Sequence, residues 1–264
     1  MIDSPLVSPA WLADRLADPD CRVVDVREPW EYESIGHIPG AVNIPFGRYR
    51  NRDTADPGTL PGAGRVSQLF EKAGIMPETT VVAYDDTHGV FAARFVLTAL
   101  AYGHTNVRLL DGDFTSWRTA FSVTTGQPNI NASAYPLDGL SPNSPILDEH
   151  DLERTVTNSE VTLIDTREQA EYDAFHLPGA VRLDWLELVD DETRRIKTAD
   201  EIDALLAARG IETDRSTSIV LYCNTARRLS HTFVVLRSLG FEDVRIFEGQ
   251  LSDVSSIDAV DTAR

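Results

Sequence analysis

Short apolar runs alternate along the chain with stretches whose apolar residues recur at helical spacing. The runs contain many β-branched residues and indicate buried strands. They cover residues 22–27, 81–84, 106–110 and 219–222. The amphipathic stretches indicate helices. They lie near residues 9–21, 64–74, 91–102 and 229–236. This alternation predicts an α/β fold with a parallel central sheet flanked by helices.

Local signals place the ends of several predicted helices. Ser8 precedes Pro9, and this pair suits an N-cap followed by a first helical position. Gly74, Gly103 and Gly240 stand where three predicted helices stop, as glycine commonly does at a helix C-terminus.

The pattern of the first half starts again in the second half. Three segments recur in the same order at an offset of about 140 residues. Residues 24–42 match 164–181, residues 82–85 match 220–223, and residues 103–112 match 240–249. Ordered repetition of this kind indicates one duplicated domain.

The segment between the two copies is rich in Asn, Pro, Gly, Ser and Thr and has no periodicity, which is typical of a linker. We therefore divide the chain into three parts. They are a first domain at residues 1–122, a linker at 123–144 and a second domain at 145–264.

A cysteine stands between a predicted strand and a predicted helix in the second domain. Cys223 ends the strand, and Arg227 and Arg228 follow four and five positions later. A loop from a strand end to a helix start directs backbone N–H groups inward and forms a pocket for an anion. The thiolate of Cys223 is favoured there, which predicts a reactive nucleophile. The alternative is a buried structural cysteine.

The first copy differs at this position. Asp85 stands where the second copy has Cys223, and Thr87, His88 and Gly89 replace the two arginines. A carboxylate within a ring of inward N–H groups would itself resemble the bound anion. We therefore expect the first domain to be catalytically silent and mainly structural.

These residues resemble the tandem-domain rhodaneses, which comprise thiosulfate sulfurtransferases and their relatives that use 3-mercaptopyruvate. The resemblance covers nearly the whole chain. It rests on the pattern Asp-x-Arg-Glu … Glu-Tyr … His-x-Pro-Gly-Ala, which begins at Asp25 and again at Asp165, and on residues 222–232 around Cys223. It implies two α/β domains, each with a parallel central sheet flanked by helices.

The resemblance also implies a reaction. Sulfane sulfur would pass from thiosulfate to cyanide or a thiol through a persulfide on Cys223, with no metal or organic cofactor. The partners are then a small sulfur donor and a small acceptor. The substrate-binding residues would be those of the loop after the cysteine, namely Asn224, Thr225, Ala226, Arg227 and Arg228. Asp165 and Arg167 are candidate supporting residues at a neighbouring strand end.

Several positions depart from the family pattern. Asn224 and Thr225 replace Arg and Lys of many thiosulfate-using members, and Glu171 replaces a substrate-binding Arg of some members. Ala226 replaces a glycine, so we expect this position to adopt a conformation that a Cβ tolerates. The positive charge near the sulfur would then rest on Arg227 and Arg228 alone.

These departures keep alternatives open. One is 3-mercaptopyruvate as the donor, and another is a sulfur carrier or binding scaffold without efficient catalysis. A phosphatase is a third, but related phosphatase loops place an arginine six positions after the cysteine, where this chain has Leu229.

Composition excludes some partners and says little about the chemistry. The net charge of −18 argues against nucleic-acid binding, which needs a basic face. It fits either a high-salt cytoplasm or a genome that favours Arg over Lys. No apolar run approaches the roughly 20 residues of a membrane helix, and no secretory signal is visible. The two cysteines make no disulfide framework, so we expect a reducing cytoplasm. Because no long apolar run is present, we expect no membrane partner.

Other polar residues are interpreted as structural. His37 and His176 occur in both copies, which favours a role in stabilising turns. His231 is expected to be a structural hydrogen-bonding residue within the last predicted helix. Asp165 and Arg167, repeated as Asp25 and Arg27, are expected to bond to each other or to nearby backbone. The basic cluster at residues 194–197 is interpreted as a solvated face.

Overall fold

The computed structural model describes residues 4–51, 59–156 and 158–249. Residues 250–264, the end of the predicted second domain, lie outside the described residues. The first half contains strands β1 Leu6–Val7, β2 Cys21–Asp25, β3 Val42–Asn43, β4 Thr80–Tyr84 and β5 Val107–Leu110. Its helices are α1 Pro9–Ala13, the π-helix η1 Glu31–Ile35, the 3-10 helix η2 Phe46–Arg48, α2 Ala63–Lys72, α3 Val90–Ala101 and α4 Asp113–Ala120.

The second half repeats this plan with one added hairpin. Its strands are β6 Val161–Asp165, β7 Val181–Arg182, β8 Val189–Asp190, β9 Arg195–Ile196, β10 Ser218–Tyr222 and β11 Val244–Phe247. Its helices are α5 Glu149–Val156, α6 Gln169–Ala174, the 3-10 helix η3 Trp185–Leu188, α7 Ala199–Ala208 and α8 Arg227–Ser238.

Each half builds one parallel sheet. The strand order is β1-β5-β4-β2-β3 in the first half and β11-β10-β6-β7 in the second. In both sheets the strand before the characteristic loop, β4 or β10, lies between two neighbours on the same sheet. Strands buried on both faces read as continuous apolar runs, which is why the sequence showed them clearly. The predicted fold of two α/β domains with parallel sheets is confirmed.

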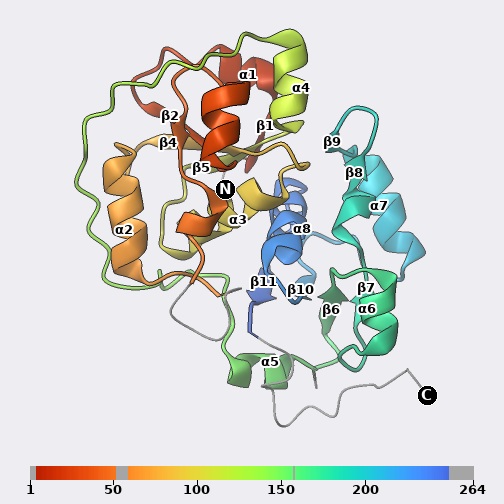
Figure 1. The fold of residues 1–264 in the computed structure, drawn as a ribbon. Coiled ribbons are helices and arrows are strands. Elements are labelled where there is room, and N and C mark those ends of the chain that lie inside the picture. The colour runs from red at the N-terminus through yellow and green to blue at the C-terminus, as the bar shows by residue number, and fades with distance from the viewer. Residues whose placement is uncertain (1–3, 52–58, 157, 250–264) are drawn as a thin grey trace.

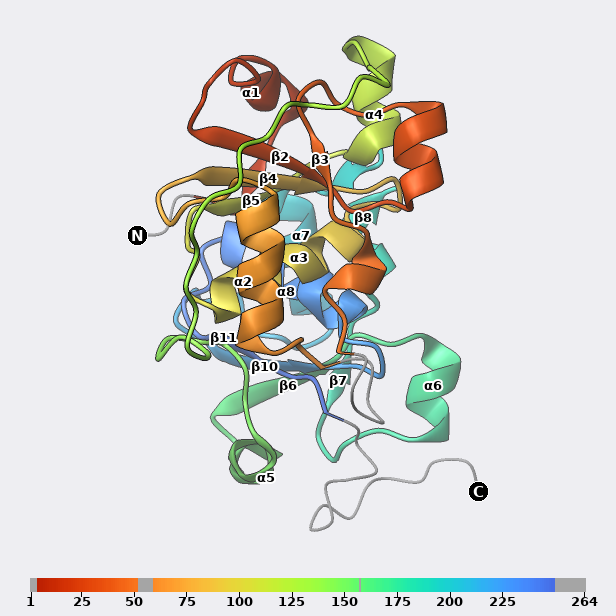
Figure 2. The same ribbon diagram turned by 60° about the vertical axis from the view of Figure 1, so that its left-hand side comes forward.

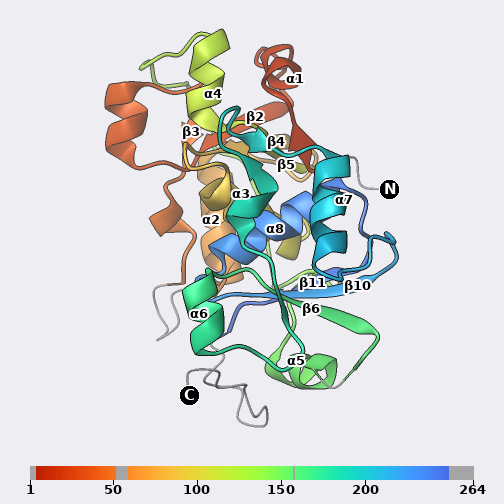
Figure 3. The ribbon, with the colours of Figure 1, turned by 90° about the vertical axis from the view of Figure 1, so that its right-hand side faces the viewer.

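The two sheets are separated by a layer of helices. Figure 2 shows α2, α3, α7 and α8 between the sheets, with α1 and α4 outside the first sheet and α5 and α6 outside the second. Helices α3 and α8, which follow the two matched strands, pack directly against each other and cross the centre of the molecule (Figures 1 and 3). Both are apolar on several sides because they are covered by their own sheet and by the other domain.

One apolar core runs through both halves. A single cluster of buried side chains joins Phe95 of α3 in the first half to Phe233 and Leu236 of α8 in the second. Smaller clusters lie on the outer face of each sheet, around Trp117 in the first half and Tyr222 in the second.

Local signals in the sequence acted as predicted. The Ser8 hydroxyl accepts a hydrogen bond from the Trp11 backbone N–H at 3.1 Å, which caps α1 with Pro9 as its first residue. Gly74 and Gly103 follow α2 and α3 with φ of +65° and +88°. These left-handed conformations end helices at little cost only for glycine.

An acidic residue directly after β5 and another directly after β11 each contact the opposite half. Asp111 Oδ1 accepts a hydrogen bond from the backbone N–H of Ile196 at 2.8 Å. Glu248 Oε1 accepts one from the backbone N–H of Leu60 at 2.8 Å, and its other oxygen binds the buried guanidinium of Arg94 at 2.8 Å. These contacts hold the two halves together at both ends of the interface.

The segment at residues 123–144 lies along the first half and contains no helix or extended strand (Figure 1). Tyr135 in this segment is buried, with its ring edge-on to Phe70 at 4.9 Å and its hydroxyl 2.8 Å from Nδ1 of His104. Residues 145–147 already bond to Ile246 of β11 in the second sheet. The segment is therefore packed against the first domain along part of its length.

Candidate active site

Cys223 is placed by the end of strand β10. The strand lies between β6 and β11, and the residue directly after Tyr222 emerges at the carboxyl edge of the sheet. Helix α8 begins four residues later at Arg227. The thiol is buried, with 1% of the residue exposed, at the base of the loop. This is the strand–loop–helix arrangement that the sequence predicted.

The matching loop of the first half shows what such a loop binds. Asp85 Oδ1 accepts hydrogen bonds from the backbone N–H groups of Thr87 and Gly89, both at 2.8 Å. Its Oδ2 accepts from Phe91 at 2.7 Å and Ala92 at 3.0 Å. Burial raises the pKa of Asp85 to about 6, while these four N–H groups act in the opposite direction. The ring of inward N–H groups that the sequence predicted is present, and a carboxylate fills it.

The loop after Cys223 keeps a left-handed turn without a glycine. Ala226 has φ of 55° and ψ of −6° and precedes the first residue of α8. Ala226 was expected to adopt a conformation that a Cβ tolerates, and the left-handed region is tolerated by a Cβ only at a cost. The turn before α3 is likewise left-handed, at Gly89 with φ of 84°. The geometry that joins the strand to the helix therefore requires the positive φ in both halves.

Arg228 is held by a carboxylate from helix α6. Its Nη1 and Nη2 atoms donate hydrogen bonds to the two carboxylate oxygens of Glu171, at 2.5 and 2.9 Å. Nδ2 of Asn224 also donates to Glu171, at 2.9 Å. Burial opposes the charge of Arg228, but hydrogen bonds to Glu171 and the proximity of Cys223 raise its pKa. Arg228 is thus an ion-paired group, and Glu171 is a site residue that the sequence marked only as a departure.

Arg227 is placed against aromatic rings of the first domain. Its guanidinium carbon lies 4.9 Å from the ring centre of Phe91 and 5.6 Å from that of Phe46. Arg50 lies over the same Phe46 ring at 5.3 Å. Burial, followed by the charges of Arg50 and Arg228, lowers the pKa of Arg227. The expectation that the local positive charge rests on Arg227 and Arg228 alone is therefore wrong, because Arg50 contributes and Glu171 offsets Arg228.

Asp165 and Arg167 bond to each other, as the sequence predicted. Both carboxylate oxygens of Asp165 accept from Arg167, with the shortest contact at 2.7 Å, and both residues are buried. Asp25 and Arg27 repeat the pair in the first half. Arg167 Nη1 also lies 3.4 Å from Oδ1 of Asn224, so the pair contacts the active-site loop through this asparagine.

The repeated histidines stabilise turns, as predicted. Nδ1 of His37 is 2.9 Å from the carbonyl oxygen of Tyr32, and the two rings stack. Nδ1 of His176 is 2.9 Å from the carbonyl oxygen of Tyr172, again with stacked rings. His231 is structural, as expected, and the backbone of His88 lies close to its ring. It is fully buried edge-on to Trp185, and neither ring nitrogen makes a well-aligned hydrogen bond to a described residue. Burial lowers its pKa to about 3.

The basic cluster at residues 194–197 does not form a solvated face. Arg194 donates to Oδ2 of Asp113 from Nε at 2.9 Å and from Nη2 at 2.6 Å, and Nη2 also donates to the Asp86 carbonyl oxygen at 2.8 Å. Arg195 pairs with Asp111 at 3.0 Å. The hairpin formed by β8 and β9 therefore joins the second half to the loop of the first half.

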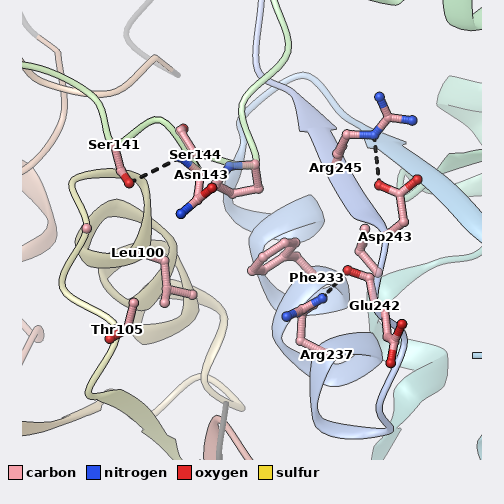
Figure 4. A pocket seen from close by; sticks show the side chains of 13 residues that line it. Leu100, Thr105, Ser141, Asn143, Ser144, Phe233, Arg237, Glu242, Asp243 and Arg245 are labelled. Carbon is pink, nitrogen blue, oxygen red and sulfur yellow. Dashed lines mark hydrogen bonds and ion pairs between the residues drawn. The ribbon is translucent and has the colours of Figure 1, made fainter. Parts of the chain in front are cut away.

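A cavity of about 580 Å³ lies at the far ends of α3 and α8 (Figure 4). Leu100 and Phe233 lie on the two helices that face each other across it, and Ser141 and Asn143 contribute polar groups from the interdomain segment. The guanidinium of Arg237 donates to backbone carbonyl oxygens of residues 241 and 242. Because Cys223 lies at the opposite end of α8, this cavity is separate from the candidate active site.

No group of three or more His, Cys, Asp or Glu residues within the described ranges has the arrangement of a metal site. In the same part of the chain, no helix is long and apolar enough to cross a membrane.

Fold and site together define a class, a duplicated α/β protein in which one strand–helix loop begins with a buried cysteine and the matching loop is filled by a carboxylate. Comparison with known families agrees with this description. The model of the rhodanese-like domain matches the chain twice, at residues 8–120 and 148–256. The chain belongs to the rhodanese family.

Named relatives align along almost the whole chain. A thiosulfate sulfurtransferase of Corynebacterium glutamicum is 30% identical, and the alignment covers 94% of this chain and 86% of the relative. The sulfur carrier protein TtuD of Thermus thermophilus is also 30% identical, with 98% and 96% covered. The crystal structure of SseA from Escherichia coli, a 3-mercaptopyruvate sulfotransferase, has the same fold, with a TM-score of 0.78, 24% identity, and coverage of 95% of this chain and 100% of SseA.

Proposed function

We propose that this protein is a sulfurtransferase that carries sulfane sulfur as a persulfide on Cys223, with thiosulfate as the donor. The Cys223 thiolate attacks the outer sulfur of thiosulfate, the S–S bond of the donor breaks, and sulfite leaves with the bonding electron pair. Cyanide or a thiolate then attacks the outer sulfur of the persulfide and releases the Cys223 thiolate. Each step is a nucleophilic displacement and needs no external oxidant or reductant.

The observation that carries this proposal is the ring of N–H groups around Asp85. Two parts of the chain share one fold, and Cys223 takes the strand-end position that Asp85 takes in the other half. By this match, N–H groups of Thr225, Ala226, Arg228 and Leu229 would face the sulfur of Cys223. Preorganised N–H donors stabilise negative charge as it develops on the transferred and leaving atoms.

Other residues support binding and orientation. Arg227 would provide positive charge for the oxyanion end of the donor from the wall that it shares with Phe46 and Phe91. Asp165 and Arg167 would position Asn224, and through it the loop, rather than touch the donor. A thiol nucleophile must remain reduced, so we place the reaction in a reducing compartment such as the cytoplasm.

A sulfur carrier is the second candidate. It has specific support because a relative of almost the same length is named sulfur carrier protein TtuD. The Glu171–Arg228 ion pair also weakens the case for efficient turnover of thiosulfate, and it favours a donor with less charge, such as 3-mercaptopyruvate. All of these candidates share the persulfide on Cys223 and differ in the donor or in the rate of release.

The test is sulfur transfer to cyanide with thiosulfate and 3-mercaptopyruvate as separate donors. We expect Cys223→Ala to abolish transfer and to leave the free energy of unfolding nearly unchanged, because only a small buried group is removed. The matched control is Cys21→Ala, which removes the buried cysteine of β2. Burial raises the pKa of Cys21 to about 11, so its thiol is inert at neutral pH and activity should persist.

Mass spectrometry separates the candidates. A persulfide on Cys223 that passes to cyanide supports the enzyme, and a persulfide that stays on the protein supports the carrier. Two results would contradict the proposal. One is a folded wild-type protein that gains sulfur from neither donor. The other is sulfur transfer that persists in Cys223→Ala.

A further inference from the structure

Glu171 occupies the groups that would otherwise receive an anionic donor. Its two oxygens accept from both Nη atoms of Arg228, and one of them also accepts from Asn224. The carboxylate of Glu171 is 30% exposed, while the guanidinium of Arg228 is 14% exposed. The hydrogen bond from Arg228 is the largest effect on Glu171 and lowers its pKa, so this carboxylate is ionised at neutral pH.

A structural role alone does not explain this contact. Glu171 also accepts from the backbone N–H of Glu168, which completes the capping box of α6. In the first half, Glu31 accepts in the same way from Glu28. However, the first half has Phe91 as the second residue of α3, where Arg228 is the second residue of α8. Capping is therefore common to both halves, while the pairing with arginine is confined to the half that carries the cysteine.

The pairing has an unequal effect on donors of different charge. A guanidinium that holds two carboxylate oxygens has the geometry by which it would hold two oxygens of a donor. A dianion must displace Glu171 or lie near its negative charge, and this repulsion grows with the charge of the donor. On the other side of the loop, Arg227 lies beside Phe46 and pairs with no carboxylate of the residues that the structure describes. The Arg227 guanidinium therefore still attracts a donor that carries a single negative charge.

We propose that Glu171 is a specificity-determining residue that weakens the binding of dianionic sulfane-sulfur donors, thiosulfate included, relative to monoanionic ones. This inference rests on the proposed function of Cys223 and concerns the same site. Glu171 competes with the donor for Arg228, so the main effect of Glu171 is on donor binding. Its effect on the displacement step itself is small.

Two donors that differ in charge provide the test. Thiosulfate carries two negative charges, and attack by Cys223 releases sulfite. Benzenethiosulfonate carries one negative charge and has the same reactive S–S bond. Attack by the Cys223 thiolate on its outer sulfur breaks that bond and releases benzenesulfinate. Both reactions leave the same persulfide, so a difference between them reports on the donor.

The variant is Glu171→Gln, which keeps a side-chain oxygen for the capping box and removes the charge. We expect the KM for thiosulfate to fall roughly tenfold, which corresponds to about 1.4 kcal/mol, with little change in kcat. The KM for benzenethiosulfonate should change less than about threefold. The matched control is Glu168→Gln, which removes the same charge from the exposed start of the same helix, away from Arg228. It should leave the ratio of the two KM values unchanged.

Equal changes for both donors, no change for either, or the same ratio shift in Glu168→Gln would overturn the inference. Failure of the proposed function has a different result, because wild-type protein would then form no persulfide with either donor. In that case the role of Glu171 is still tested by calorimetry. The affinity for thiosulfate is measured for the single variant Cys223→Ala and for the double variant Cys223→Ala with Glu171→Gln. Tighter binding by the second protein supports the role of Glu171, and equal binding contradicts it.

Discussion

At the scale of single residues, Ala226 shows how the active-site loop accepts backbone strain. A non-glycine residue in the left-handed region costs roughly 1–2 kcal/mol, and Ala226 has φ of 55°. We predict that Ala226→Gly raises the free energy of unfolding by about 0.5–1 kcal/mol, because relief of strain exceeds the added entropy of the unfolded chain.

Urea denaturation followed by circular dichroism measures this change. The matched control is Ala207→Gly on the exposed side of α7, where the backbone is helical. That variant should be destabilised by about 1 kcal/mol. Destabilisation of both variants to the same extent would mean that Ala226 is not strained.

The sequence singled out Cys223 as the candidate nucleophile but did not reveal its full environment. Cys223 stood out because its strand and helix are local patterns, and Asp165 and Arg167 were recognisable because the first half repeats them. Glu171 and Arg228 are 57 positions apart, and their contact has no counterpart in the first half. The family pattern therefore marked Glu171 as a departure, while comparison of the two halves matched it to Glu31, and neither showed its partner.

At the scale of elements, the β8–β9 hairpin joins the halves through Arg194. This residue contacts Asp113, whose side chain is fully buried, and the backbone of the first-half loop. We predict that Arg194→Ala lowers the free energy of unfolding by about 2 kcal/mol, because it leaves a buried carboxylate without its ionic partner. Chemical denaturation of the full chain measures this.

The control for that prediction is Arg118→Ala, which removes an exposed arginine from α4. An exposed charge of this kind contributes less than about 1 kcal/mol. If both variants lose the same small amount of unfolding free energy, Arg194 of the hairpin does not help to hold the halves together.

Elements with strong periodicity were predicted within a few residues of their observed ends, as β4, α3, β10 and α8 show. The hairpin, the π-helix η1 and helices α4, α5, α6 and α7 were not predicted, and the helix predicted to reach residue 21 ends at Ala13. The hairpin has only two residues in each strand, and its ends are fixed by contacts with Asp111 and Asp113 in the other half. Such distant contacts leave no periodic signal in the local sequence.

At the scale of the whole molecule, the continuous core predicts that the halves unfold together. The apolar cluster that joins α3 to α8 is shared, so neither half can expose its inner helix without disrupting the other. We expect differential scanning calorimetry to show one transition, with equal calorimetric and van't Hoff enthalpies. Two separated transitions would show that the halves are independently stable.

The acidic residues at the interface make equivalent contacts in both directions. Asp111 and Glu248 occupy matching positions in the two halves, and so, within one residue, do the backbone groups of Ile196 and Leu60 that they bind. Because each half supplies one acceptor and one backbone donor, loss of either acidic side chain leaves the other of these two bonds between the halves in place.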